Sequence, residues 1–127
     1  MGSISDSLNN LINSKKSEAN QYKADIAKYQ QGVGDLEKAK KLFEESYKKM
    51  CSLIYETDGV FQGDAATQFC LKLTTYNNAV KDMPPIMERR IQAFKKRINE
   101  LERQKGWCEF WTGVYTGLMS TFKFFNL

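Results

Sequence analysis

The chain has 127 residues, a net charge of +4 and no histidine. This length fits one domain, and the missing histidine removes the side chain that most often serves as a general base or a metal ligand. Because the chain contains only two prolines and eight glycines, few positions can interrupt a helix, and the composition predicts an all-α protein.

The three cysteines, Cys51, Cys70 and Cys108, lie far apart in the sequence and form no C-x-x-C pair. We therefore expect no zinc site, and no other metal or cofactor. No nucleophile motif or phosphate-binding loop is present, so we expect no catalytic residue and a protein that is not an enzyme. The sequence positions of Cys51 and Cys70 are compatible with either a disulfide bond or two free thiols.

The first ten residues lack the basic segment and apolar core of a secretory signal peptide. We therefore expect synthesis in the cytoplasm, with any export using a route that needs no cleaved leader. Ser3 or Ser5 is expected to cap the first helix, with Asp6 in its first turn.

A seven-residue repeat of mainly apolar residues runs from Leu8 to Ile54 and predicts a long helix with a coiled-coil seam. Only Lys15 and Lys40 interrupt it, and such polar seam residues are expected to set register and the choice of partner. The two columns of this seam are Leu8, Lys15, Tyr22, Tyr29, Leu36, Phe43 and Met50, and Ile12, Ala19, Ile26, Val33, Lys40, Tyr47 and Ile54.

The segment from about residue 58 to 64 is expected to form a turn. Asp58-Gly59 and Gly63 supply permissive backbone, and Asp64 is a good N-cap for the next helix. Because the connection is short, the helices on either side should run antiparallel, which predicts a helical hairpin.

A second heptad pattern follows, for which we expect nearly collinear helices over about 65–83 and 85–105. The Pro84-Pro85 pair should kink or split the helix, and the companion column resumes one place later after it. Residues 1–105 would then form the hairpin domain. The main column is Ala66, Leu73, Val80, Met87, Phe94 and Leu101, and the companion column is Phe69, Tyr76 and Met83 followed by Ile91 and Ile98.

The last segment, residues 106–127, is expected to be a separate amphipathic helix with an aromatic face. Further apolar residues lie beside the seams of the hairpin, and a two-helix hairpin cannot bury both sets. This surplus predicts a helical protein partner, although a tail that folds back to close a bundle within the chain is an alternative. The expected partner interface is Leu11, Leu42, Leu53, Leu71, Trp107, Phe110, Trp111, Val114, Tyr115, Leu118 and Phe122.

The turn reads Phe61-Gln62-Gly63-Asp64-Ala65-Ala66-Thr67-Gln68-Phe69. This segment resembles the W-x-G turn of the Esx-like, WXG-type proteins of bacterial type VII secretion. The matching residues are Phe61, Gly63, Ala65 and Phe69, with Phe61 where the family has tryptophan. The resemblance covers residues 3–105 and is greatest to the YwqH-like small helical partners of LXG-domain toxins in Gram-positive bacteria.

The resemblance implies a chaperone-like partner and targeting factor. The chain would bind the helical N-terminal domain of an LXG toxin, alone or with a second small helical protein, and would reach the secretion ATPase only indirectly. No Tyr-x-x-x-Asp/Glu export element is present, so the partner would supply the signal, and the chain would leave the cell with it if it is exported.

Other functions stay open. The turn could belong to an ordinary helical hairpin, or the chain could be a self-associating, exported Esx-like protein. The basic segment 88–105 could contact nucleic acid, although no DNA-binding motif accompanies it. The aromatic tail could also contact a membrane, although its apolar stretch between Glu109 and Lys123 is too short to span one.

Overall fold

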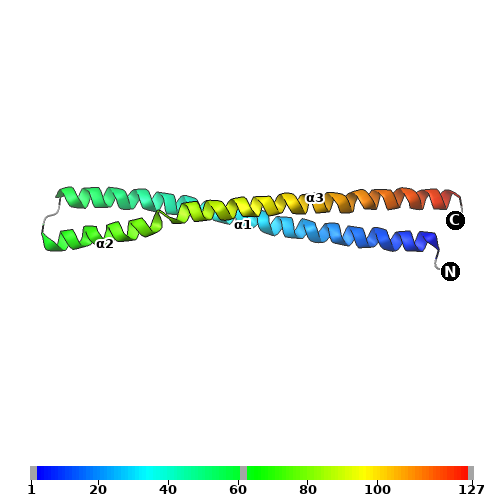
Figure 1. The fold of residues 1–127 in the computed structure, drawn as a ribbon, viewed down its shortest axis with the longest axis horizontal. Coiled ribbons are helices and arrows are strands. Elements are labelled where there is room, and N and C mark those ends of the chain that lie inside the picture. Colours follow the sequence, from blue (N-terminus) through cyan, green and yellow to red (C-terminus); the bar gives the residue numbers. More distant parts are fainter. Residues whose placement is uncertain (1–2, 61–62, 126–127) are drawn as a thin grey trace. The chain divides into compact units, whose positions relative to one another are not determined.

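The computed structural model describes residues 3–60 and 63–125, without the side chains of residues 57–60 and 66. It contains the helices α1 (Ile4–Val60), α2 (Asp64–Val80) and α3 (Met83–Phe124), and the described residues include no strand (Figure 1). The prediction of an all-α helical hairpin is confirmed.

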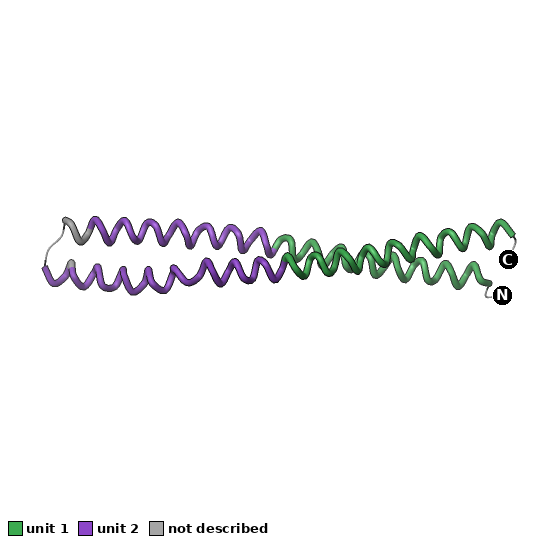
Figure 2. The backbone as a smooth tube through the Cα atoms, turned by 45° about the horizontal axis from the view of Figure 1, so that its top comes forward, with its two compact units in different colours: residues 1–31, 95–127 green, residues 32–94 purple. Residues whose placement is uncertain are grey.

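The chain divides into two compact units, residues 1–31 with 95–127 and residues 32–94 (Figure 2). In the first unit, the beginning of α1 lies beside the C-terminal part of α3, and the second unit pairs the rest of α1 with α2 and the start of α3. Side-chain contacts give the direction: Glu18 meets Cys108 in the first unit, whereas Lys40 meets Glu88 and Cys51 meets Asn77 in the second. In the second unit, the residue farther along α1 contacts the residue that lies earlier in the facing helices, so the paired helices are antiparallel.

The seam predicted for α1 is confirmed at every position. All residues of its two columns are buried or half-buried, and Leu8, Ile12 and Ile26 are among the core residues. Ser3 caps the helix, because its Oγ accepts a hydrogen bond from the Asp6 amide at 3.1 Å.

The companion column of the second heptad differs from the prediction. Phe69 and Tyr76 are exposed, while Cys70 is half-buried and Asn77 is buried. The observed column therefore keeps its seven-residue spacing, and the predicted phase shift at the prolines is wrong. Its members are Cys70, Asn77, Pro84, Ile91, Ile98, Lys105, Thr112 and Met119.

The helix break lies directly before the proline pair. Helix α2 ends at Val80, and α3 begins at Met83, so Pro84 and Pro85 occupy the first turn of α3. Neither proline has an N–H, so the helical hydrogen bonds to the carbonyls of Val80 and Lys81 cannot form. The interruption consequently falls at Lys81 and Asp82.

The turn is shorter than predicted. Helix α1 continues to Val60, so Asp58 and Gly59 lie within it. Gly63 is the N-cap residue of α2, and its φ of 108° is a conformation that favours glycine. Asp64, predicted as the N-cap, is instead the first helical residue. Phe61 lies outside the described residues.

The aromatic tail is not a separate helix. Helix α3 continues without interruption through residues 105 and 106, the predicted boundary. The seam also continues into the tail, where Cys108 is buried and Tyr115 and Phe122 are half-buried. The tail thus pairs with the beginning of α1, and these two helical segments form the hairpin of the first unit.

Candidate protein-protein interface

Heptad letters describe the two sides of each seam. On α1, the columns that contain Ile12 and Leu8 are a and d; on α2 and α3, the columns that contain Cys70 and Leu73 are a and d. The residue before each a position is g, and the residue after each d position is e.

In this antiparallel pairing, the g residues of both helices lie on one side of the seam, and the e residues of both helices lie on the other. Two g residues contact the d column of the facing helix: Glu18 approaches Cys108, and Arg97 bonds to Tyr29. Two e residues contact the a column, since Glu88 pairs with Lys40 and Cys51 with Asn77. Each unit therefore has one g face and one e face.

The two faces differ in chemistry. Within the described residues, the e positions carry polar side chains and Cys51, with no large apolar residue. The g positions instead carry exposed apolar side chains in both units. The e residues are Asn9, Lys16, Lys23, Gln30, Glu37, Glu44, Cys51, Thr67, Thr74, Lys81, Glu88, Lys95, Glu102, Glu109, Thr116 and Lys123.

The first-unit g face consists of Ile4, Leu11, Glu18 and Asp25 on α1 and Arg97, Gln104, Trp111 and Leu118 on α3. All its apolar members are at least 40% exposed. Trp111 belongs to a row of aromatic rings along α3, with centroids 5.5 Å from Phe110 and 5.8 Å from Tyr115. Trp107 meets Phe110 edge-on at 5.7 Å. These contacts restrict the rings, which lowers the entropy lost when a partner covers them.

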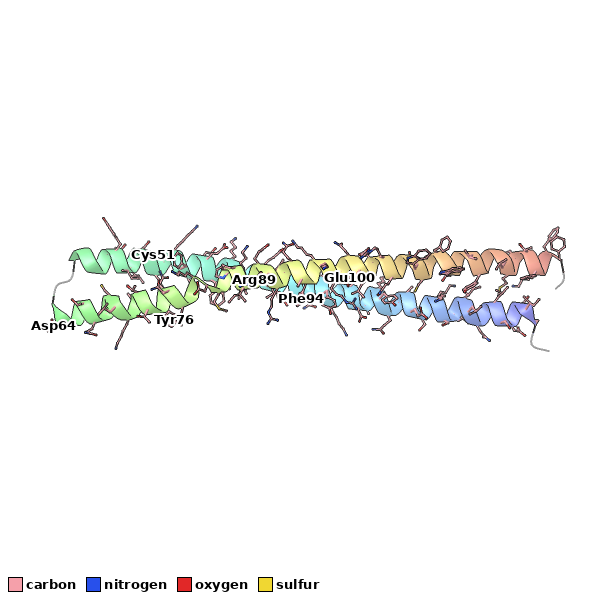
Figure 3. The ribbon with its side chains drawn as sticks, viewed as in Figure 1. Cys51, Asp64, Tyr76, Arg89, Phe94 and Glu100 are labelled. Atoms are coloured by element: carbon pink, nitrogen blue, oxygen red, sulfur yellow. The ribbon has the colours of Figure 1, made fainter. Side chains whose placement is uncertain are left out.

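The second-unit g face consists of Gly32, Ala39, Ser46 and Leu53 on α1, Phe69 and Tyr76 on α2, and Met83 and Arg90 on α3. Phe69 is 50% exposed and Tyr76 63% exposed. Figure 3 shows Tyr76 on α2, with Cys51 on the facing stretch of α1. A shallow groove beside Tyr76 is lined by Leu71, Lys72, Thr75 and Ala79.

The residues predicted for the partner interface fall into three groups. Leu11, Leu53, Trp111 and Leu118 occupy g positions and are exposed. A second group, Leu42, Leu71, Trp107 and Phe110, is exposed at positions farther from the seam. The third group is half-buried and consists of Val114, Tyr115 and Phe122, of which the last two pack in the seam.

Sequence reasoning missed four apolar members of the g faces. Ile4 was not singled out, and Phe69, Tyr76 and Met83 were placed in the seam rather than beside it. The signal that could have located them is their position directly before an a residue of an unbroken heptad column.

Of the two seam lysines, Lys40 bridges the two helices. Its Nζ lies 2.8 Å from Oε2 of Glu88 on α3 and 4.0 Å from Glu44 on its own helix. The hydrogen bond to Glu88 raises the pKa of Lys40. Lys15 instead pairs within α1, 3.5 Å from Glu18. Lys40 thus has the geometry of a residue that fixes the pairing of α1 with α3.

A second polar site lies in the seam near Cys51. The Asn77 amide donates a hydrogen bond to Cys51 Sγ at 3.2 Å, whereas its buried Oδ1 has no hydrogen-bond partner among the described residues. Tyr47 shares a hydrogen bond with the same thiol, which raises the pKa of Tyr47. All three cysteines are free thiols.

No group of three or more His, Cys, Asp or Glu side chains in the described part of the chain is placed to hold a metal ion. In residues 3–60 and 63–125, no helix has an apolar stretch long enough to cross a bilayer. Neither a protein-family model, nor a curated protein, nor a solved structure matches this chain.

Proposed function

We propose that this chain is a non-enzymatic helical partner and targeting factor that binds the helical N-terminal domain of an LXG-type toxin for type VII secretion. The observation that carries the proposal is the one-sided distribution of exposed apolar residues, which occupy the g faces of both units and not the e faces.

The a, d and g pattern is typical of helices in larger bundles. A two-stranded coiled coil needs apolar residues only at a and d, whereas a helix that packs against two neighbours extends its apolar stripe to e or g. Here g positions such as Leu11, Leu53 and Trp111 extend that stripe. Helices of a second polypeptide would cover these side chains, each large one contributing about 1.5–3 kcal/mol when fully buried.

The resemblance to WXG-type proteins supports the identity of that polypeptide. Gly63, with its positive φ, lies at the turn as the resemblance implies. The toxin domain, alone or with a second small helical protein, would supply the export signal that this sequence lacks. The complex would form in the cytoplasm and present that signal to the secretion ATPase.

Co-purification tests the proposal. The full chain is co-expressed with the tagged helical N-terminal domain of the LXG toxin encoded beside it, and we expect a stable complex. In a Leu53→Glu, Tyr76→Glu variant, charges on the second-unit g face should reduce recovery at least about tenfold, since each buried unpaired charge costs several kcal/mol.

The matched control carries two added acidic residues on the e face of the same unit, Thr67→Glu and Thr74→Glu, and should bind like the parent chain. Failure of the parent chain to retain the toxin domain would overturn the proposal. Equal loss in both variants would contradict the assignment to the g face.

A further inference from the structure

The tail has an uncharged side that faces away from α1. On each helix, positions b and c follow a, and f follows e, so f lies opposite the seam, with c and then g on one side of it. Between residues 107 and 125 of α3, no c, f or g position carries a charged side chain. These positions form the tail outer face, which consists of Trp107, Phe110, Trp111, Val114, Gly117, Leu118, Thr121, Phe124 and Phe125.

Most side chains of the tail outer face are exposed. Phe124 is 82% exposed, Trp107 61% and Phe110 56%. The charged residues of the tail, Glu109 and Lys123, both lie at e, beside the seam. A helix with aromatic and apolar residues on one side and polar residues on another is typical of proteins that lie in the interface of a bilayer.

The direction of this face distinguishes a bilayer from a helical partner. Helices that complete a four-helix bundle would pack along the g face, against Trp111 and Leu118, and f residues of such bundles point outward. A partner of this kind would leave the f residues Phe110 and Phe124 exposed. A bilayer surface is broad enough to cover the c, f and g positions together.

The same side of α3 is cationic directly before the tail. Its f and g positions include Lys96, Arg97 and Arg103, whereas the acidic residue at c, Glu100, pairs with Arg97 at 3.2 Å. Arg103 has no ion-pair partner among the described residues. Positive side chains beside an apolar face complement the negative headgroups of an anionic bilayer.

A shallow depression connects the cationic and aromatic parts of this side. It is lined by Arg103, Gly106, Trp107 and Phe110. A Cβ on Gly106 would meet nothing within 4 Å, so no neighbouring side chain fills the space above this glycine. A guanidinium can bind phosphate through two hydrogen bonds, and aromatic rings prefer the boundary between headgroups and acyl chains. The depression therefore combines groups suited to the two parts of a phospholipid.

We propose that the tail outer face is a membrane-docking surface that lies flat on an anionic bilayer. Lys96, Arg97 and Arg103 contact the lipid phosphates, and the aromatic rings enter the boundary between headgroups and acyl chains. The opposite side of the helix stays packed against α1. This surface belongs to the first unit and acts without the toxin, so its test is independent of the second-unit variants.

The first test is flotation of the purified full chain with vesicles of phosphatidylglycerol and phosphatidylcholine in equal parts. We expect binding that high salt weakens. Phe110→Ser combined with Phe124→Ser should lower the partition coefficient at least about tenfold, because both rings leave the acyl boundary. Neither residue belongs to a g face. The control, Tyr55→Ser with Ile86→Ser, removes two exposed apolar side chains from the second unit and should bind like the parent chain.

The second test removes charge instead of aromatic rings. Lys96→Gln combined with Arg103→Gln should lower the partition coefficient at least about tenfold and make it less sensitive to salt. The matched control, Lys16→Gln with Lys23→Gln, makes the same charge change on the e face of the first unit. It should change binding less than about twofold, since these lysines lie away from the docking surface.

The third test reports which surface touches the lipid. The two tryptophans of the chain, Trp107 and Trp111, both belong to the tail outer face. On vesicle binding, their emission should shift to shorter wavelength and be quenched by brominated acyl chains.

The proposal is overturned if the chain does not bind anionic vesicles, if it binds without these spectral changes, or if the control variants lose binding equally. Circular dichroism checks that each variant remains helical. Loss of toxin binding by the Phe110→Ser, Phe124→Ser variant with unchanged vesicle binding would also overturn the proposal, because it would assign the face to a protein partner.

Discussion

Gly32 and Gly34 lie two positions apart in α1 but in different surroundings. A Cβ on Gly32 would lie 2.9 Å from Cε2 of the Phe94 ring, whereas a Cβ on Gly34 would meet nothing within 4 Å. Phe94 is half-buried in the seam, so its ring has limited room to move away. Of these two glycines, only Gly32 is required by close packing.

This difference predicts opposite effects of the same substitution. Gly34→Ala should raise the free energy of unfolding by about 0.5–1 kcal/mol, because alanine favours the helix. Gly32→Ala should lower it by about 1 kcal/mol, since the steric cost of an overpacked seam, about 1–3 kcal/mol, exceeds that gain. Urea denaturation of both variants measures the two changes, and equal stabilisation would show that the Phe94 ring yields freely.

Cys108 is the buried thiol of the first unit. Burial raises the pKa of this thiol, and its contact with Glu18 at 3.4 Å raises it further. The folded chain therefore keeps the thiol protonated at pH values where the unfolded chain begins to lose the proton. The stability from this group is complete below the unfolded pKa of about 8.5 and decreases as the pH rises toward the folded pKa.

We therefore expect the free energy of unfolding to fall more steeply between neutral and alkaline pH in the parent chain than in Cys108→Ala. Urea denaturation across that range compares the two slopes, so the cost of the smaller side chain cancels. Parallel slopes would show that Cys108 does not contribute to the pH dependence.

At the scale of the elements, the α2 seam contains one buried polar residue, Asn77. Its Nδ2 has a sulfur acceptor, but its Oδ1 has no partner among the described residues, and a buried unsatisfied acceptor costs stability. A polar a residue of this kind restricts the registers that two helices can adopt. Asn77 therefore reduces stability while it favours one pairing of α1 with α2.

Asn77→Leu should raise the free energy of unfolding by about 1–2 kcal/mol, because it removes the unsatisfied group and adds apolar contact. Asn78→Leu, at the next and exposed position, should change it by less than about 0.5 kcal/mol. Urea denaturation distinguishes the two variants, and destabilisation by Asn77→Leu would indicate that Oδ1 has a hydrogen-bond partner in solution.

At the scale of the whole molecule, the hairpin combines an apolar seam with polar seam residues in both units. Lys15 lies in the first unit and Lys40 in the second, and both are partly exposed. Lysines at such positions cost stability in a coiled coil but limit which helices can pack there. We therefore expect both units to contribute to the choice of partner.

The double variant Lys15→Leu, Lys40→Leu should have a higher melting temperature and bind helical partners less selectively. Circular dichroism gives the first quantity, and competition between the toxin domain and an unrelated helical hairpin gives the second. Unchanged selectivity would contradict the specificity role of the two lysines.

Much of the fold and part of the site follow from the sequence because hydrophobic periodicity is a local property. The α1 seam from Leu8 to Ile54 and the all-α class were predicted in this way and are confirmed. The exposed apolar residues Leu11, Leu53 and Trp111 could likewise be recognised as surplus to the seam.

Only the tertiary structure decided which neighbouring positions face the seam. Phe69 and Cys70 are adjacent on a helix, about 100° apart, and both can be buried, so hydrophobicity alone favoured the aromatic residue. Packing against α1 instead places Cys70 and Asn77 inside and leaves Phe69 and Tyr76 on the g face. The facing helix selects the phase, and it also makes the tail part of the hairpin, because the Cys108 thiol donates its hydrogen bond to Glu18 on α1.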